Sequence, residues 1–424
     1  MKLGAFEIKG WCPGALRPMP SGDGLVVRVR PMLGRLSLSQ LIALAEAAER
    51  FGNGQIDLTR RANLQIRGVD EAKLASLQGA IRSLGLLDAD ARAESARNIM
   101  VSPLSGIEPA AHDVGSVAAD LGQSLADDPA LWGLPVKFGF IVDGGGSLDL
   151  MMERADIRVV AINDRDFAIG LDRKAGIEWL GSVAREAAAE TAITIAASFV
   201  HVNATATGRM RDLCDEGIAK ICSRMKSRIS PLLLAVAHKE PAKLAGLFDF
   251  GAGHFAVGIA IPFGRVESDQ ILALAEEMVD ASVAEVRLSP WRMLYARVDD
   301  MSAGHRILDA AAARGWIVTP DDPLLQIEAC PGAPSCTSTS LDTRAAARQI
   351  AAQWPAGFKG TAHVSGCAKG CARSQPSNLV LVGNGDHYGI VRNGTARDKV
   401  SGEVSLGDLP AHLHQIYGFR HTYD

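Results

Sequence analysis

The chain has no large excess of charge of either sign. Its 44 Lys and Arg residues nearly balance 48 Asp and Glu residues, which leaves a formal net charge of −4. A surface of this kind has no overall basic field to hold nucleic acid or an anionic membrane. Any anionic ligand must therefore be bound by a local group of Lys and Arg side chains.

Long apolar runs and a disulfide framework are also absent. No run reaches the roughly 18–20 residues of a membrane span, and residues 1–9 lack the apolar stretch of a signal peptide. We therefore expect a cytoplasmic protein, whose thiols stay reduced. The seven cysteines are odd in number, which argues against paired disulfides.

A dinucleotide-binding loop is missing too. The segment Gly383–Asp386 contains two glycines but not the G-x-G-x-x-G pattern between a strand and a helix. It predicts a hairpin turn instead. A nicotinamide coenzyme that supplies electrons to this chain is therefore expected to act through a partner reductase.

The chain has the size and composition of a multidomain globular protein. Hydrophobic residues make up 47% and charged residues 22% of its 424 residues, which is ordinary for a soluble protein with sizeable cores. This length predicts two to four domains.

An internal repeat relates two parts of the sequence. Each copy contains a strand-like segment, then a Gly-Arg pair that leads into an alanine-rich helix, then a second strand-like segment. Chance similarity between two such helices is the alternative, but the matching flanks favour duplication. The first copy comprises residues 25–30, 34–46 and 55–59, and the second comprises residues 255–260, 264–276 and 285–289.

Larger α/β regions follow each copy. Their periodicity predicts strands, helices and a hairpin. The order is small, large, small, large, which suggests a pseudo-twofold protein with a ligand site between its halves. The predicted strands are 134–142, 157–162, 379–382 and 388–391, and the predicted helices are 177–189, 305–314 and 343–354. The expected modules are 1–80 (small), 90–235 (large), 245–303 (small) and 304–424 (large).

Four of the seven cysteines form two pairs in one short stretch. Cys330 and Cys336 make a C-x5-C pair, and Cys367 and Cys371 make a C-x3-C pair. Two loops with two thiolates each can supply the four ligands of a [4Fe–4S] cluster. Structural zinc and unrelated buried cysteines are the alternatives, although zinc sites usually have tighter spacing. The other cysteines, Cys12, Cys214 and Cys222, are expected to be ordinary thiols.

Glycines accompany these cysteines. Gly332, Gly366 and Gly370 lie within or beside the two pairs. Glycine lets the backbone approach closely and offers N–H groups to cluster sulfurs.

The cysteine spacing and the duplication resemble the sulfite and nitrite reductases over nearly the whole chain. The resemblance implies their α+β fold, in which two small ferredoxin-like half-modules and two larger α/β modules have pseudo-twofold symmetry. It also implies that the cluster binds Cys330, Cys336, Cys367 and Cys371, of which Cys371 would bridge to a siroheme iron in the reductases.

The same resemblance implies a set of residues that bind a tetrapyrrole. Residues 59–65 are similar to the segment around the first siroheme arginine of the family, which places Arg61 there and Arg60 and Gln65 beside it. Arginine binds carboxylates bidentately, and each charge-assisted bond is worth roughly 1.5–3 kcal/mol. Segment 96–99 places Arg97 and segment 134–139 places Lys137, while Arg67, Arg287 and Arg292 are further candidates.

Two positions depart from the reductase pattern. Val136 replaces an arginine, and Gly139 replaces a lysine that helps to protonate sulfite or nitrite in the reductases. These departures put simple anion reduction in doubt.

Within this superfamily, segments 10–19, 21–25 and 58–68 resemble the precorrin-3B synthase family. This resemblance implies an O2-dependent hydroxylation of precorrin-3A with lactone formation. It further implies a [4Fe–4S] cluster, a mononuclear non-haem iron, and NADH as the electron source. A siroheme-dependent sulfite or nitrite reductase is the alternative function, and a tetrapyrrole carrier with a cluster or zinc is the second alternative.

The ligands of a mononuclear iron cannot be assigned by pattern. Non-haem oxygenases often use two histidines and a carboxylate. His363 lies four residues before Cys367 and is the histidine expected nearest the ligand, whereas His201 lies in a strand-like run. The remaining candidates are expected at the surface: His238 in the His238-Lys239-Glu240 segment, and His412, His414 and His421 in the tail.

Overall fold

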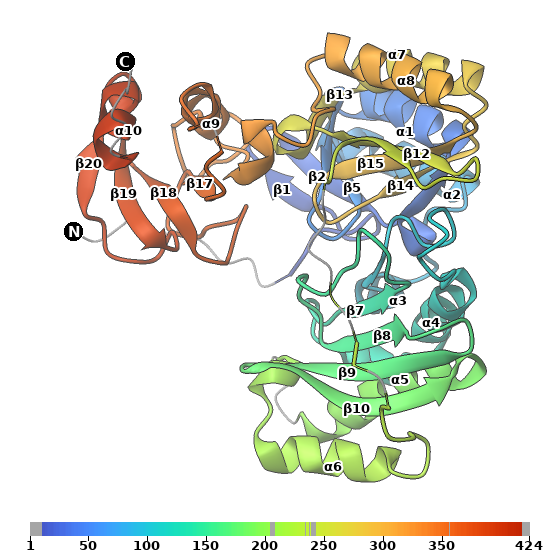
Figure 1. Cartoon of the computed structure of the whole chain (residues 1–424). Coiled ribbons are helices and arrows are strands. Elements are labelled where there is room, and N and C mark those ends of the chain that lie inside the picture. The colour runs from blue at the N-terminus through green and yellow to red at the C-terminus, as the bar shows by residue number, and fades with distance from the viewer. Residues whose placement is uncertain are drawn as a thin grey trace.

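The computed structural model describes residues 11–203, 208–233, 235–236, 238, 243–355 and 357–417. These residues form four five-stranded sheets. In Figure 1 two sheets and their helices make a central block, and the other two sheets form lobes that extend from it below and to the left. This α+β architecture confirms the fold class predicted from the sequence.

The two sheets of the central block exchange one strand each. Strand β13 belongs to the second repeat but pairs with β4 of the first, while β3 of the first repeat pairs with β14 of the second. The first sheet has the order β1 (Met19–Ser21), β2 (Gly24–Val29), β5 (Leu64–Val69), β4 (Gln55–Leu58), β13 (Arg265–Glu267). The second has the order β11 (Gly246–Asp249), β12 (Phe255–Ala260), β15 (Met293–Val298), β14 (Glu285–Leu288), β3 (Arg35–Ser37).

Helices cover one side of this block and enclose its core. Helix α1 begins after Ser37, which forms a capping box with Gln40, and it buries Leu41 and Leu44. The predicted repeat is confirmed, because α7 follows β13 as α1 follows β3. The helices of the block are α1 (Leu38–Phe51), α2 (Leu74–Ser83), α7 (Ser268–Asp280) and α8 (Met301–Ala313).

Backbone strain repeats with the same spacing. Leu33 and Phe263 have φ values of 60° and 57°, and Ala62 and Arg292 have values of 51° and 61°. Residues other than glycine rarely adopt this left-handed backbone conformation. Its recurrence at matched positions shows that the two copies share tight turns before the helix and between the last two strands.

The two lobes have the same strand order. In each, three parallel strands are followed by two antiparallel ones. The first lobe contains β6 (Ile99–Val101), β7 (Phe140–Asp143), β8 (Ile157–Ala161), β9 (Asp166–Arg173), β10 (Gly176–Ala184), α3 (Ala91–Ala96), α4 (Gly115–Asp127), α5 (Arg185–Val202) and α6 (Asp215–Met225). The second contains β16 (Ile327–Ala329), β17 (Ala362–Ser365), β18 (Ser377–Asn384), β19 (His387–Gly394), β20 (Gly402–Val404), α9 (Thr343–Ala352) and α10 (Leu409–Tyr417).

Two predicted elements of the first lobe are wrong. The helix predicted at 177–189 is a strand up to Ala184, and α5 begins only at Arg185. Pairing of β10 with β9 along its length outweighs the helical spacing of the apolar residues. The strand predicted at 134–142 forms only from Phe140, because the residues before it make a turn that leads into β7.

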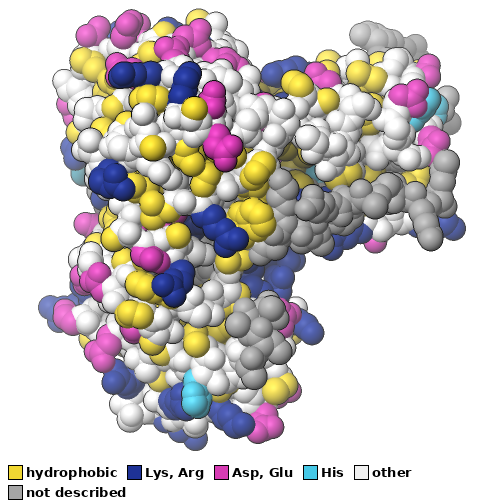
Figure 2. Space-filling view, turned by 180° about the vertical axis from the view of Figure 1, so that it is seen from behind, with side chains coloured by type: hydrophobic (Ala, Val, Ile, Leu, Met, Phe, Trp, Pro, Cys, Tyr) yellow, Lys and Arg dark blue, Asp and Glu magenta, His cyan; other side chains and the backbone are white. Residues whose placement is uncertain are grey.

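The remaining predicted elements agree with the structure. Strand β8 and helices α8 and α9 lie where they were expected. The segment Gly383–Asp386 joins β18 to β19 as a hairpin, as predicted. No helix among the described residues has both the length and the apolar character to cross a membrane. Figure 2 shows Lys and Arg side chains scattered over the lobes on its visible face rather than gathered in one field.

Candidate functional site

The four clustered cysteines lie in two loops at one edge of the second lobe. Cys330 directly follows β16, and Cys367 comes two residues after β17, its parallel neighbour. Parallel strands end at the same edge of a sheet, so their loops meet there. The backbone N–H of Gly366 donates to the Sγ of Cys330 over 3.1 Å, which joins the two loops directly.

Glycines allow this close approach. Gly332 has a φ of +65°, and a Cβ there would lie 2.6 Å from the Oγ1 of Thr343. A Cβ at Gly366 would lie 2.4 Å from a side-chain carbon of Thr339. Any side chain at these positions would force the loops apart. Beside them lies a cavity of about 320 Å³, lined by Cys367, three glycines, an alanine, an asparagine and the hydroxyl residues Thr337, Ser338, Thr339 and Ser340.

The four thiols lie within electrostatic reach of one another. Burial raises the pKa of Cys371 to about 11, Lys369 lowers it, and the other three clustered cysteines raise it further. Burial also raises the pKa of Cys330. Such thiols bind metal only as thiolates, so a positively charged group must stabilise the deprotonated form.

Within the described part of the chain, no three His, Cys, Asp or Glu side chains converge closely enough to hold one metal ion. Thiolates around a zinc ion lie about 2.3 Å from it and therefore close together. The four thiolates of a [4Fe–4S] cluster bind four different irons and are spaced more widely. The glycine-lined loops fit the cluster better than the single ion.

The first lobe has the same two loops without the thiols. Ser102 follows β6 as Cys330 follows β16, and the N–H of Gly144 donates to its Oγ over 2.9 Å. Counting onward with the same spacing, Glu108, Gly145 and Asp149 correspond to the other three cysteines. Only the second lobe can therefore present four thiolates at this place.

A largely buried carboxylate, with 14% of its side chain exposed, binds three arginines just before the first cysteine loop. Glu328 on β16 binds Arg60 at 2.6 Å, Arg373 at 2.8 Å and Arg292 at 3.2 Å. Burial alone would raise the pKa of Glu328, but Arg60 and Arg292 lower it to about 2. The group carries a surplus of positive charge close to the cysteines.

His363 is the buried histidine expected nearest the ligand. It lies on β17 opposite Glu328, it has no exposed surface, and its Cε1 lies 3.7 Å from the position of a Cβ at Gly370. Neither ring nitrogen has a hydrogen-bond partner among the described residues. Burial lowers its pKa to about 4, so the ring is neutral at pH 7. A buried unpaired imidazole is costly unless a bound group supplies its partner.

The turn between β4 and β5 lies where the three parts of the molecule meet. Arg60 reaches the second lobe through Glu328 and approaches Glu153 of the first lobe at 3.6 Å. Arg61 points to the first lobe, where its Nη1 donates to the carbonyl of Arg154 over 3.2 Å. Burial and the neighbouring Arg209 lower the pKa of Arg61. Among its described contacts Arg61 has no carboxylate in hydrogen-bond range, so it is available to an anionic ligand.

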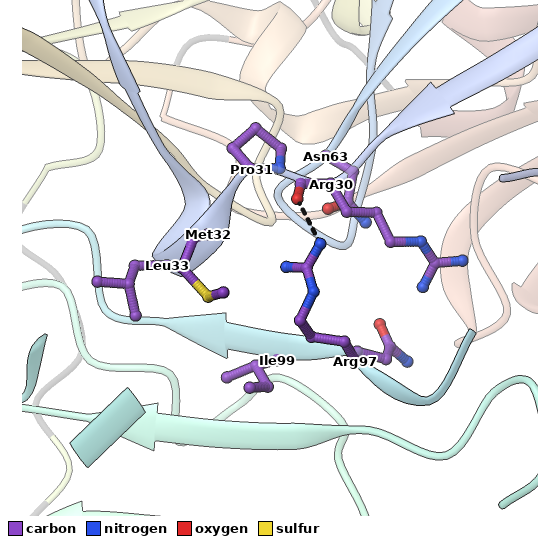
Figure 3. Close-up of a pocket in the computed structure, with 8 residues that line it drawn as sticks. Arg30, Pro31, Met32, Leu33, Asn63, Arg97 and Ile99 are labelled. Atoms are coloured by element: carbon purple, nitrogen blue, oxygen red, sulfur yellow. Dashed lines mark hydrogen bonds between the residues drawn. The ribbon is translucent and has the colours of Figure 1, made fainter. Parts of the chain in front are cut away.

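Arg97 is already paired in the structure. Its guanidinium binds Asp88 at 2.7 Å and donates to the main-chain carbonyl of Arg30 over 3.0 Å. Figure 3 shows Arg97 reaching up to that carbonyl from the segment before β6, in a pocket of about 10 Å³. Lys137 is exposed and precedes β7. The tetrapyrrole contacts of Arg97 and Lys137 stay predictions.

Two arginines next to this region were not predicted from the sequence. Arg28 lies in β2, and Arg30 directly follows its last residue. Residues two apart on a strand point to the same face, and this spacing is the signal in the sequence that could have identified them. Burial and Arg30 lower the pKa of Arg28 to about 10, and Cys12 interacts with both side chains. Gln65, oriented with its amide oxygen toward Arg28, accepts from that guanidinium at 2.9 Å.

The further arginine candidates all have partners within the protein. Arg67 binds Asp23 at 2.6 Å and Asp57 at 3.3 Å. Arg287 binds Glu285 at 2.7 Å. Arg292 belongs to the Glu328 group and donates to the carbonyl of Ala372 over 3.3 Å. These contacts give each of them a structural role.

The other candidate histidines lie on other elements or outside the described residues. His201 lies in α5, not in a strand, so that prediction is wrong. His238 is exposed, as expected, but its Nδ1 bonds to buried Asp149 at 2.9 Å. His412 lies on α10 and is partly exposed. Lys239, Glu240, His421 and the side chain of His414 lie outside the described residues.

Comparisons with known proteins agree with this arrangement. The family described as the nitrite/sulfite reductase ferredoxin-like half domain matches residues 17–84. The solved structure of the NirA protein of Mycobacterium tuberculosis aligns with a TM-score of 0.75 over 94% of this chain and 82% of its own, at 19% identity. That likeness shows a shared fold.

Two classes of relative share sequence with the chain. Ferredoxin-dependent sulfite reductase of M. tuberculosis is 24% identical over 84% of the chain and 69% of its own length, and a ferredoxin–nitrite reductase of Leptolyngbya laminosa is 24% identical over 88% and 79%. A precorrin-3B synthase of a Sinorhizobium species is 32% identical over 96% of the chain and 88% of its own length. The chain therefore belongs to the precorrin-3B synthase family, within the superfamily of sulfite and nitrite reductases.

Proposed function

We propose that this protein is an O2-dependent monooxygenase that converts precorrin-3A to precorrin-3B in cobalamin biosynthesis. One atom of O2 enters the product, as a ring hydroxyl formed together with a lactone from an acetate side chain. The other atom leaves as water, and NADH supplies the two electrons. The relative named precorrin-3B synthase supports this substrate through its 32% identity.

The observation that carries the proposal is the placement of Arg60 and Arg61. Arg60 is bound to Glu328, two residues before Cys330, while Arg61 lies against the first lobe with a backbone carbonyl as its described acceptor. A polycarboxylated macrocycle held by Arg61 would thus lie beside the cysteine loops. Gln65, Arg97 and Lys137 are proposed to bind further carboxylates.

The four cysteines are proposed to hold a [4Fe–4S] cluster. The direct bond from Gly366 to Cys330 and the close glycine contacts support this set. Such a cluster supplies single electrons when bound. The mononuclear iron implied by the resemblance has no ligand group among the described residues, and no step is assigned to it.

Electrons are proposed to come from NADH through a partner reductase, because the sequence has no dinucleotide-binding pattern. The partner is defined only by its chemistry: it accepts two electrons from NADH and passes them on one at a time.

The test combines composition with isotope labelling. Protein purified without oxygen is assayed for iron, acid-labile sulfide and tetrapyrrole, and is then incubated with precorrin-3A, NADH, a reductase and ¹⁸O2. We expect cluster absorption without bound siroheme, and one ¹⁸O atom in the product. Product that takes its oxygen from water would contradict the monooxygenase.

A siroheme-dependent sulfite or nitrite reductase is the second candidate, supported by the 24% identical relatives. Gly139 argues against it, since the chain has no lysine at that position. Stoichiometric siroheme in the purified protein, with reduction of sulfite or nitrite, would establish this function instead.

A further inference from the structure

We propose that Gly139 is a specificity-determining residue of the tetrapyrrole site. Because it has no side chain, Arg61 can lie against the start of β7 and present its guanidinium to a substrate carboxylate. This inference rests on the proposed function and names the residue that selects which cation fills this part of the site.

The backbone of Gly139 is fixed on several sides. Its N–H donates to the Oδ2 of Asp156 over 2.9 Å, and its carbonyl accepts from the N–H of Asp156 over 2.8 Å. The preceding carbonyl, of Phe138, accepts from the Nδ2 of Asn98 over 2.9 Å. The backbone therefore cannot shift to make room for a side chain.

A Cβ at this position would meet two neighbours. It would lie 3.1 Å from the Nη1 of Arg61 and 3.1 Å from the Nδ2 of Asn98. Asn98 is buried and bonded to Phe138, whereas the side chain of Arg61 has a single described hydrogen bond, to the carbonyl of Arg154. Arg61 is the side chain that must move, and a bidentate contact with a carboxylate is sensitive to such movement.

The charges around Gly139 leave Arg61 as the cation open to a ligand. Asp156 is only 1% exposed and binds Arg209 at 2.6 Å, so these two groups neutralise each other. Arg61 lies near both but forms no ion pair within 4 Å with a described carboxylate. A lysine at position 139 would place a second cation where the guanidinium of Arg61 lies, and two like charges repel each other strongly in a partly buried site. Glycine therefore favours a carboxylate-binding arginine over a lysine that could donate protons.

The test is a double-mutant cycle on ligand binding, using uroporphyrin III as a stable polycarboxylated probe. Binding is followed by quenching of tryptophan fluorescence in the protein as purified, with its cofactors. We expect Arg61→Ala to weaken binding roughly tenfold or more, and Gly139→Ala to weaken it several-fold. In the Arg61→Ala background, Gly139→Ala should have no further effect. Gly79→Ala is the matched control, since nothing lies within 4 Å of a Cβ there.

The outcomes separate this inference from the proposed function. If Gly139→Ala weakens binding equally in both backgrounds, or leaves it unchanged while Arg61→Ala weakens it, the inference is wrong. If Arg61→Ala does not change binding, Arg61 is not in the tetrapyrrole site and that part of the proposed function fails. If Gly139→Ala does not fold, the same cycle is run in an Asn98→Ala background, where the contact of the new Cβ with the Asn98 amide is removed and the contact with Arg61 remains.

Discussion

Arg265 on β13 and Asp57 on β4 lie opposite each other on neighbouring strands, and their side chains form a bidentate ion pair with N–O distances of 2.7 and 2.9 Å. Arg67 and Arg344 also approach Asp57, at 3.3 and 3.5 Å. Burial alone would raise the pKa of Asp57, but Arg265 and the other two arginines hold it below its ordinary value. Arg265 also donates to the Oγ of Ser335 over 2.8 Å, which ties the first cysteine loop to the central block.

Replacing Asp57 by Asn should destabilise the protein strongly. The substitution leaves three partly or fully buried guanidinium groups without their shared carboxylate, and breaking a buried ion pair of this kind costs about 3–5 kcal/mol. Urea unfolding followed by circular dichroism measures the loss. Asp120→Asn, at an exposed position of α4, is the control. Equal urea midpoints for Asp57→Asn and the control would show that the group contributes nothing.

Glu328 should make stability depend on acid pH. Its pKa falls from the ordinary 4.5 to about 2 in the folded state, so the unfolded chain takes up the proton first as the pH is lowered. The contribution, about 3 kcal/mol, is full above pH 4.5 and is lost as the pH falls from there toward 2. Urea midpoints of the wild type and Glu328→Gln should differ most at pH 7, and the difference should shrink below pH 4.5 and disappear as the pH approaches 2. A difference that does not change with pH would contradict this assignment.

Each of the four clustered cysteines should be required for the iron–sulfur content. Serine at position 330, 336, 367 or 371 removes one thiolate, and we expect most of the iron, the acid-labile sulfide and the visible absorption to be lost. Cys214→Ser is the matched control, because Cys214 is exposed at the start of α6. Full iron and sulfide content in any one of the four variants would remove that cysteine from the ligand set.

His363→Leu should stabilise the protein only when the cofactor is absent. In protein stripped of metal by a chelator, the change removes a buried polar ring without a described partner and should raise the free energy of unfolding by about 1–3 kcal/mol. In protein that retains its cluster, this gain should vanish, because the ring then has a partner. Thermal unfolding of both forms measures the difference. His387→Leu, at the exposed start of β19, is the control, and a gain of equal size in both forms would contradict the explanation.

The sequence predicted those features that depend on local patterns. Repeated helices and strands were visible because their apolar spacing is set within a few residues, as with Leu41 and Leu44 on α1. The hairpin at Gly383–Asp386 likewise followed from its turn residues. The metal group indicated by the spacing of Cys330 and Cys336 stays a prediction.

Long-range pairing was beyond such patterns. The helix predicted at 177–189 failed because β10 pairs with β9, and that pairing is not a property of the segment alone. The contact of Arg60 with Glu328 joins residues 268 positions apart, so neither side chain indicates the other. Arg28 and Arg30 could have been found, since both lie on one face of a predicted strand.

The exchange of β3 and β13 has a consequence for the folding of the chain while it is being synthesised on the ribosome. The outer edge of β4 gains its partner only when β13 emerges, since Arg265 follows Asp57 by 208 residues. Until then the nascent chain carries an unpaired strand edge, which is a surface prone to association with other chains. Closing so long a loop also slows folding. Neither half can complete its central sheet alone, so a chain interrupted between the halves is expected to need chaperones or the missing half itself.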